Sequence, residues 1–313
     1  MDPITHGVVG LAIAAFTGET VSIASPYAMG SLLGAVIPDA DIIMQVKGDY
    51  SYLKNHRGMS HSIPFIFLYS AAITAVLSLF YPGAALLKLF IYAVSGCMSH
   101  LLLDITNSYG AQVLWPFYKK KITLDLLLVY DPLLIIVALA IIIPSINSKI
   151  HPLVSLIMFF AYLSARYWMK FYVKKRVKEN FKDLGEILYI RVLPSMIGLV
   201  KWHFVIKIKD KMVIGELNLL SRKIKIIEIM KNLDKRLFRA VKNTQVAKFF
   251  GEFTPLFHIK CKKTDSGYEY SFIDLRYYIA KDFLHQSTAV MNENFRLVAS
   301  AFHPYHKTRN VEI

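Results

Sequence analysis

The sequence predicts an α-helical integral membrane bundle of about six helices, followed by a small β-rich α+β domain in the cytoplasm. Apolar residues make up 55% of the chain and the mean hydropathy is +0.41, both high for a soluble protein. Long apolar runs occur only within residues 1–183, whereas shorter runs rich in β-branched residues fill residues 184–313. These two stretches are the two predicted domains.

Six apolar runs account for the predicted bundle. Four of them approach the roughly 20 residues that a bilayer core requires: 63–81, 84–105, 124–144 and 152–172. The first two runs, 4–16 and 26–44, are shorter and rich in Gly and Ala. Each of these two is expected to be a helix that either spans the bilayer or only enters it.

Basic residues predict the orientation of the bundle, because short loops rich in Lys and Arg stay in the cytoplasm. Lys and Arg gather within 47–57, 119–121 and 170–182, whereas the alternate loops hold only Lys88 and Lys149. Both termini of a multi-pass protein are then cytoplasmic. Residues 184–313 hold 22 Lys and Arg against 12 Asp and Glu, which suits the anionic inner leaflet. Nucleic acid is the rival partner, but the lysines form no recognisable reader motif.

The predicted tail contains seven short strands: 187–193, 202–208, 212–217, 224–230, 256–261, 268–275 and 295–301. The second and third are spaced as a hairpin around Asp210-Lys211, and residues 234–249 have helical periodicity. Only two cysteines are present, Cys97 and Cys261, which excludes a disulfide framework and a cysteine-type zinc site. Any metal must therefore be held by histidines and carboxylates.

Ionisable residues recur where the apolar runs of the first 131 residues meet one side of the membrane. They fall into five clusters: His6; Asp39 and Asp41; His56, Arg57 and His61; His100 and Asp104; Asp125 and Asp131. Charged groups at such depths are costly unless they are paired or coordinated, so a cluster of them indicates a functional site.

Two of the clusters have ligand-like spacing. His100 and Asp104 stand four apart and project from one helical face, so both can reach one metal; a structural His–Asp pair is the alternative. Asp39 and Asp41 follow Pro38 as alternate acids that suit a divalent cation, and a solvated helix end is the alternative.

The segment 56–62 joins two histidines to an arginine. Gly58 lets the backbone turn so that His56 and His61 can face one centre, and Arg57 offers a permanently charged fork. The alternative is a solvated loop in which Ser60 or Ser62 caps the third helix. His6, at the start of the first helix, has a structural role as its alternative. Asp131, which precedes Pro132, has a helix cap as its alternative. The six histidines further along the chain are expected to be structural or solvated: His151, His203, His258, His285, His303 and His306.

The clustered motifs also carry a family resemblance. Thr5-His6-Gly7, Pro38-Asp39-x-Asp41, His56-Arg57-Gly58-x-Ser60-His61-Ser62 and His100-x-x-x-Asp104 resemble the YdjM/YfhP family of bacterial inner-membrane proteins. That family is described as metal-dependent hydrolases, some of them LexA-binding or LexA-regulated. The match covers the membrane half, and Trp202 with Asp274-Leu275-Arg276-Tyr277 resembles the C-terminal part of the YfhP-like branch. The resemblance implies a bacterial inner-membrane location and metal-site roles for His6, Asp39, Asp41, His56, His61, His100 and Asp104.

The expected function is metal-assisted hydrolysis at the cytoplasmic membrane interface. One or two divalent ions are expected, with zinc favoured by the imidazoles and manganese or magnesium by the carboxylates. Asp41 or Asp104 is the expected base, and Arg57 is expected to stabilise growing anionic charge. A site at headgroup depth favours an amphipathic ester or phosphoester, such as a phospholipid or an isoprenoid phosphate.

Two other classes of function fit the same residues. A proton or cation transporter needs polar groups at successive depths, but the outer halves of helices three to six hold almost none, with only Ser70, Thr74 and Ser78 in helix three. A membrane scaffold with a structural metal site, whose basic tail binds a protein or nucleic acid, is the third class. Ion flux and salt-dependent DNA binding would identify these two alternatives.

Overall fold

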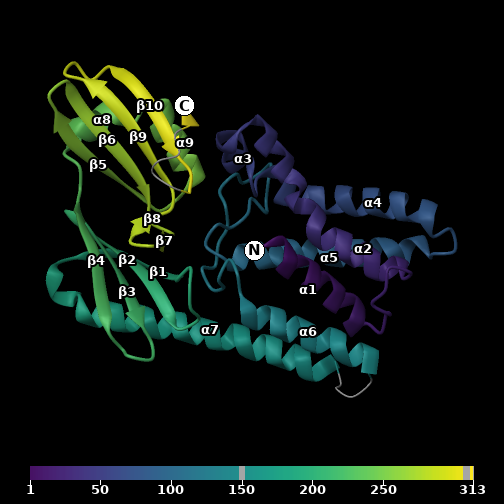
Figure 1. Cartoon of the computed structure of the whole chain (residues 1–313). Coiled ribbons are helices and arrows are strands. Elements are labelled where there is room, and N and C mark those ends of the chain that lie inside the picture. The colour runs from purple at the N-terminus through teal and green to yellow at the C-terminus, as the bar shows by residue number, and fades with distance from the viewer. Residues whose placement is uncertain (148–151, 306–310, 313) are drawn as a thin grey trace. The chain divides into compact units, whose positions relative to one another are not determined.

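The computed structural model describes residues 1–147, 152–305 and 311–312 (Figure 1). The chain forms two compact units. The membrane unit comprises Met1–Ile43 and Asn55–Tyr167, and the C-terminal unit comprises Met44–Lys54 and Trp168–Ile313. The short segment Met44–Lys54 thus belongs to the C-terminal unit, although residues of the membrane unit flank it on both sides.

The membrane unit is helical, as the sequence predicts. Its helices are α1 (Pro3–Phe16), α2 (Pro26–Val36), α4 (Ile63–Phe80), α5 (Leu86–Thr106), α6 (Pro132–Asn147) and the first half of α7 (Pro152–Asn180). Two 3-10 helices, η1 (Ile37–Lys47) and η2 (Met59–His61), and the short helix α3 (Asp49–Asn55) lie between α2 and α4. Asp2 and Ser25 cap α1 and α2 by accepting from the backbone N–H groups of Thr5 and Ala28.

One predicted helix is shorter than expected. Residues 124–131 are not helical, and α6 begins only at Pro132. Asp125 adopts a positive φ of 48°, which a right-handed helix does not allow, and Asp131 caps α6 by accepting from Leu134 N at 3.2 Å. The apolar run therefore contains a connecting segment as well as a helix.

Three described helical segments are long and apolar enough to cross a membrane: Pro26–Lys47, Ile63–Phe80 and Leu86–Thr106. Helix α1 and the segment Pro132–Ile143 are shorter apolar helices. The predicted runs 124–144 and 152–172 are not among these three segments of the described residues, so their crossing of the membrane stays a prediction. The first run loses its initial residues to the connecting segment, and the second is diluted by Arg166, Lys170 and several aromatic residues.

Small residues bring α1, α2 and α5 into close contact. A Cβ atom added to Gly10 of α1 would lie 2.7 Å from the Ala35 Cβ of α2. Side chains at Gly34 and Gly96 would overlap backbone atoms of α5 and α2, respectively. Such small-residue contacts are typical of membrane helices, where van der Waals packing supplies much of the attraction. They fix the register of α2 against α5.

The C-terminal unit contains antiparallel sheets. The first has the order β1-β2-β3-β4, the second has the order β11-β10-β9-β6-β5, and β7 pairs with β8. The strand bounds are β1 (Ile187–Pro194), β2 (Lys201–Ile208), β3 (Lys211–Asn218), β4 (Ile224–Lys231), β5 (Phe257–Thr264), β6 (Gly267–Asp274), β7 (Tyr278–Ile279), β8 (Asp282–Phe283), β9 (Gln286–Asn292), β10 (Leu297–His303) and β11 (Val311–Glu312). The seven predicted strands are present, whereas β9 and the three two-residue strands were not predicted.

Helices cover both larger sheets. Val173 and Val177 of α7 are fully buried in one core with Phe204 of β2. The predicted single helix 234–249 is instead two helices, α8 (Lys235–Val241) and α9 (Gln245–Phe253), because Thr244 caps a new helix start. The phenylalanines of α9 pack on the five-stranded sheet together with Leu53 of α3.

Candidate metal centre

The ends of three helices bring the candidate ligands together. Asp39 lies in η1, just after α2 ends, and His61 lies in η2, just before α4 begins. His100 and Asp104 occupy the last two turns of α5. Because Gly30 approaches Leu89 while Gly34 approaches Ala93, α2 and α5 run parallel and their carboxyl ends coincide.

Five of the six distances among four ligand atoms in this group are close to those of a tetrahedral site. His61 Nε2 lies 3.3 Å from Asp39 Oδ1 and 3.2 Å from Asp104 Oδ2. His100 Nε2 lies 3.0 Å from His61 Nε2, 3.6 Å from Asp39 Oδ1 and 3.5 Å from Asp104 Oδ2. A zinc ion with bonds of about 2.0–2.1 Å places its tetrahedral ligand atoms about 3.3–3.4 Å apart. The four atoms therefore fit one small cation.

Hydrogen bonds select the ring nitrogens that face the centre. His100 Nδ1 lies 2.7 Å from the Ala35 carbonyl oxygen, which can only accept, so Nδ1 carries a proton. His61 Nδ1 lies 2.9 Å from Ser60 Oγ, and Ser60 Oγ donates to Asp41 Oδ2 at 3.0 Å. The hydroxyl therefore accepts from His61 Nδ1–H. Nε2 of each ring then faces Nε2 of the other across 3.0 Å, an arrangement that a cation between them would stabilise.

The carboxylate atoms that face the centre are also available for coordination. Asp39 Oδ1 and Asp104 Oδ2 are buried and meet no hydrogen-bond geometry within the part of the chain that the structure describes, although Arg57 Nε forms an ion pair with Asp104 Oδ2. Buried polar atoms are nearly always satisfied, so two such oxygens beside two imidazole nitrogens indicate a metal site. The other oxygen of Asp104 pairs with the Met1 amine and lies 3.3 Å from His6 Nε2.

Arg57 holds Asp104 in place. Its buried guanidinium lies with Nε 3.0 Å from Asp104 Oδ2 and donates to Asn107 Oδ1 at 3.0 Å. The backbone N–H of Arg57 donates to Asp41 Oδ2 at 3.1 Å, and the residue has a φ of +57°. Arg57 thus connects two of the candidate carboxylates by its side chain and its backbone.

A second ligand group shares Asp39 with the first. Asp39, Asp41 and His56 each offer a ligand atom within 4.8 Å of the others, and all three are partly buried. His56 Nδ1 lies 2.9 Å from Asp41 Oδ1. Burial lowers the pKa of His56, although the hydrogen bond with Asp41 opposes this shift, so the imidazole is neutral at pH 7. A carboxylate common to both groups is the arrangement found in two-metal sites.

Besides Arg57, three residues of the predicted clusters lie outside these two groups. His6 stacks on His100, with ring centroids 3.7 Å apart, and contacts the outer oxygen of Asp104. Asp125 contacts Thr123 Oγ1 at 3.1 Å, and Asp131 accepts from Tyr162 OH at 2.6 Å besides capping α6. The structure thus brings together six of the seven predicted ligands, and His6 packs against them.

Sequence reasoning missed the role of Ser60 and the carbonyl of Ala35. Both fix the proton position of a histidine ligand. A serine next to a histidine is a weak signal by itself, and a backbone carbonyl leaves no mark in a sequence. Only the packing of α2 against α5 reveals the second partner.

The histidines of the C-terminal unit are structural. His203 Nε2 and His258 Nε2 lie 3.2 Å and 3.0 Å from the carbonyl oxygens of Leu275 and Lys231. Burial lowers the pKa of His203, His258 and His285 to about 4. His303 contacts Thr288 Oγ1 at 2.8 Å. His151 and His306 lie outside the described residues.

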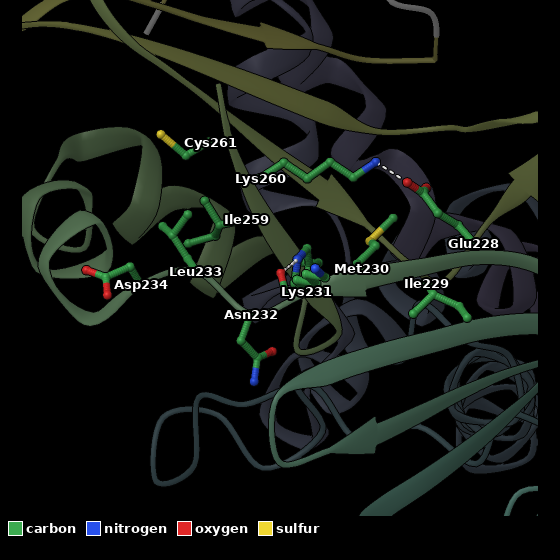
Figure 2. Close-up of a pocket in the computed structure, with 11 residues that line it drawn as sticks. Glu228, Ile229, Met230, Lys231, Asn232, Leu233, Asp234, Ile259, Lys260 and Cys261 are labelled. Atoms are coloured by element: carbon green, nitrogen blue, oxygen red, sulfur yellow. Dashed lines mark hydrogen bonds and ion pairs between the residues drawn. The ribbon is translucent and has the colours of Figure 1, made fainter. Parts of the chain in front are cut away.

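A cavity of about 400 Å³ lies between β4 and β5 in the C-terminal unit (Figure 2). An ion pair of 2.5 Å between Lys260 and Glu228 crosses it, and Asp234 lies at its other end. Its lining contains none of the residues of the two ligand groups. Lys260 and Glu228 in its lining are already paired with each other. The lining residues do not form a group of potential metal ligands like those of the membrane unit.

Comparison with known proteins places the chain in a family. A family model described as YdjM inner membrane protein matches residues 1–173, and another described as YfhP C-terminal alpha/beta plait domain matches residues 236–312. The uncharacterized protein YfhP of Bacillus subtilis is 29% identical over 289 residues, which cover 88% of this chain and 87% of that protein. The inner membrane protein YbcI of Escherichia coli is 30% identical over 121 residues, 38% of this chain and 69% of that protein. No solved structure matches the chain significantly. Because the first model covers more than half of the chain, the protein belongs to the YdjM inner membrane protein family.

Proposed function

We propose that this membrane protein is a metal-dependent hydrolase that cleaves an ester or phosphoester of an amphipathic substrate at the cytoplasmic membrane interface. The observation that carries the proposal is the convergence of two imidazole nitrogens and two buried carboxylate oxygens at near-tetrahedral spacing. A structural His–Asp pair would need only one of these contacts.

The ligand atoms favour zinc in the first group. His61 and His100 supply nitrogen, whereas the second group has one histidine and two carboxylates and so accepts manganese or magnesium more readily. A bound ion of this kind supplies Lewis-acid chemistry, because it acidifies water and polarises a carbonyl or phosphoryl oxygen. Asp39 would serve both positions.

The surrounding residues divide the remaining roles. Asp41 and His56 form a partly buried carboxylate–imidazole pair. With one ion bound, Asp41 would accept the proton of the attacking water, and His56 would hold Asp41 in place through the contact at Nδ1. With two ions bound, both residues are ligands. The geometry favours Asp104 as a ligand in preference to a base. It favours Arg57 as the positioning residue that orients Asp104, in preference to a residue that contacts the substrate.

The substrate class follows from the position of the ligands in the chain. Asp39 lies three residues after α2 ends, within the candidate span Pro26–Lys47. His61 lies two residues before Ile63–Phe80, and Asp104 lies near the end of Leu86–Thr106. A substrate that reaches all three residues needs a polar reacting group next to an apolar body. Phospholipids and isoprenoid phosphates both have this form.

A transport function is less well supported. In helix α4, Ser70 Oγ and Thr74 Oγ1 donate to the backbone carbonyls of Ile66 and Ser70, each at 2.7 Å. These hydroxyls satisfy themselves within their own helix and so offer no continuous polar path through the described part of α4.

Metal analysis of the purified protein tests the proposal. The wild-type protein is expected to carry one or two ions and to hydrolyse a panel of fluorogenic lipid esters and phosphoesters. His100→Ala should lose the ion of the first group and all turnover while remaining monodisperse in detergent. His303→Ala, which removes an imidazole from the C-terminal unit, is the matched control and should retain both. Normal metal content in His100→Ala would overturn the proposal.

A further inference from the structure

The loop formed by residues 111–122 exposes an unusual set of side chains. It connects the segment after α5 to the segment before α6, and a β-bridge between Ala111 and Ile122 closes its base. Phe117 is 96% exposed, although phenylalanine is normally buried, and Leu114 and Tyr118 are each 46% exposed. Three consecutive lysines follow: Lys119, Lys120 and Lys121.

The loop is attached to the chain that carries two metal-site histidines. Gln112 N donates to the Arg57 carbonyl at 3.1 Å, and Ile63 N, at the start of α4, donates to the Val113 carbonyl at 3.1 Å. Lys121 Nζ donates to the His56 carbonyl at 2.8 Å. These bonds fix the base of the loop against residues 56–63, so its exposed tip is held rather than free to swing.

The position of the loop relative to the spans suggests its partner. It begins five residues after Thr106, the last residue of one candidate span, and is bonded to Ile63, the first residue of another. Its tip is therefore close to the depth where both helices leave the bilayer. Exposed aromatic residues followed by lysines are typical of segments that lie at an anionic membrane surface, with rings among the acyl chains and ammonium groups at the phosphates.

We infer that the 111–122 loop is an interfacial lipid-binding element, in which Phe117 enters the bilayer and Lys119 and Lys120 hold the phosphate of an anionic phospholipid. This element would present an anionic headgroup beside the segment that bears His56 and His61. That last step rests on the proposed function, and it narrows the substrate class to an anionic phospholipid. Binding of the lipid itself does not require a metal.

The depth of the loop tip is the first test. Full-length protein with Cys97 and Cys261 replaced by alanine is spin-labelled at Phe117→Cys and reconstituted in liposomes that contain phosphatidylglycerol. The label is expected to collide more with lipid-soluble oxygen than with a water-soluble nickel chelate. Leu220→Cys is the control, because Leu220 is a comparably exposed apolar residue (80%) in the C-terminal unit. A label at 117 that is as accessible to the chelate as the label at 220 would overturn the inference.

The lysines are tested by lipid retention. Native mass spectrometry of the full-length protein in micelles with equimolar phosphatidylglycerol and phosphatidylcholine counts the lipids that stay bound. Lys119→Gln/Lys120→Gln is expected to lower the phosphatidylglycerol preference about 30-fold at low salt. Lys223→Gln/Lys225→Gln removes the same charge from exposed lysines of the C-terminal unit and should leave the preference unchanged. Equal losses in both variants would show a general charge effect and would refute the inference.

The same experiment separates this inference from the proposed function. His100→Ala should retain the full lipid preference although it loses metal, whereas Lys119→Gln/Lys120→Gln should retain metal although it loses lipid. If His100→Ala keeps its metal, the hydrolase proposal fails and lipid binding by the loop can still stand. If the lysine variant keeps its lipid, the loop inference fails and the metal centre can still stand.

Discussion

Both units of the molecule bury charged groups, but they satisfy them in different ways. In the C-terminal unit, Arg276 donates to both oxygens of Asp274, through Nε at 3.0 Å and a terminal nitrogen at 2.8 Å. Thr254 Oγ1 adds a further hydrogen bond to Asp274 Oδ1 at 3.0 Å. In the membrane unit, the inward oxygens of Asp39 and Asp104 meet no hydrogen-bond geometry within the described residues, and only Asp104 has an arginine beside it, with Arg57 Nε at 3.0 Å.

The difference separates a structural cluster from a binding site. Asp274 and Arg276 neutralise each other's charge within the fold, so this pair needs no ligand and is structural. The group around Asp39 and Asp104 has more acceptors than donors at its centre, and a cation is the partner that would complete it. Burial of charged groups alone does not identify a binding site. Buried polar atoms that face one common centre without a hydrogen-bond partner do identify one.

The largest expected effect comes from the carboxylate that the two ligand groups share. Asp39→Ala removes a ligand from each group, so we expect both ions to be lost and the metal affinity to fall at least 100-fold. In metal-free protein the same substitution removes one of the two carboxylates that face the centre and should not lower the melting temperature. Inductively coupled plasma mass spectrometry gives the metal count, and a variant that retains both ions would show that Asp39 is not shared.

Arg276→Ala should have the opposite pattern. It leaves Asp274 buried without its charged partner, which costs about 3–5 kcal/mol of stability in the C-terminal unit. Burial raises the pKa of Asp274, but the charge and hydrogen bonds of Arg276 outweigh this effect and hold it below its usual value. Hydrogen exchange of peptides from β5, β6 and β9 measures the loss, and metal content should not change. A loss of metal would mean that the structural pair also supports the site.

Helix periodicity and charge explain how much of this site could be predicted. The ends of apolar runs place His61, His100 and the acids at one depth, and i,i+4 spacing pairs His100 with Asp104. Periodicity cannot give the rotation of one helix about its axis relative to another. That rotation decides that His6 stacks beside the centre and that Asp39 belongs to both ligand groups.

The fold, like the site, could be predicted only in part from the sequence. Strands with β-branched apolar runs were found, but β9 reads Gln-Ser-Thr-Ala-Val-Met-Asn and offers no such run, although it pairs with both β6 and β10. Residues 286–292 form a strand because they pair with β6 on one side and with β10 on the other. The break between α8 and α9 depends on the side chain of Thr244, which periodicity across 234–249 conceals.

A smaller effect is expected from Ser60, which orients a ligand without being one. Ser60→Ala removes the acceptor for His61 Nδ1–H and the donor to Asp41, so the metal affinity should fall about 10–100-fold. Ser62→Ala is the matched control, because Ser62 Oγ donates only to the Met59 carbonyl in the described contacts. Competition with a chromogenic chelator measures both. Equal affinities in the two variants would show that the tautomer of His61 is fixed by another group.

The smallest effect is expected in the pH dependence of the stability of the C-terminal unit. His203 is buried, its pKa is lowered to about 4, and the unfolded chain has a histidine pKa near 6.5. The unfolded state therefore binds more protons between these values, so the stability of the C-terminal unit is full above about pH 6.5 and falls as the pH drops toward 4. At pH 5 the loss from this histidine is about 1–2 kcal/mol. Asp274 acts in the same direction but at lower pH, because a carboxylate with a lowered pKa loses its stabilising contribution mainly below about pH 3.8. His258 and His285 of the same unit also have pKa values lowered to about 4, so His203→Gln should reduce, without abolishing, the dependence of hydrogen exchange in β2 and β3 on pH over this window. An unchanged slope would show that His203 does not contribute to it.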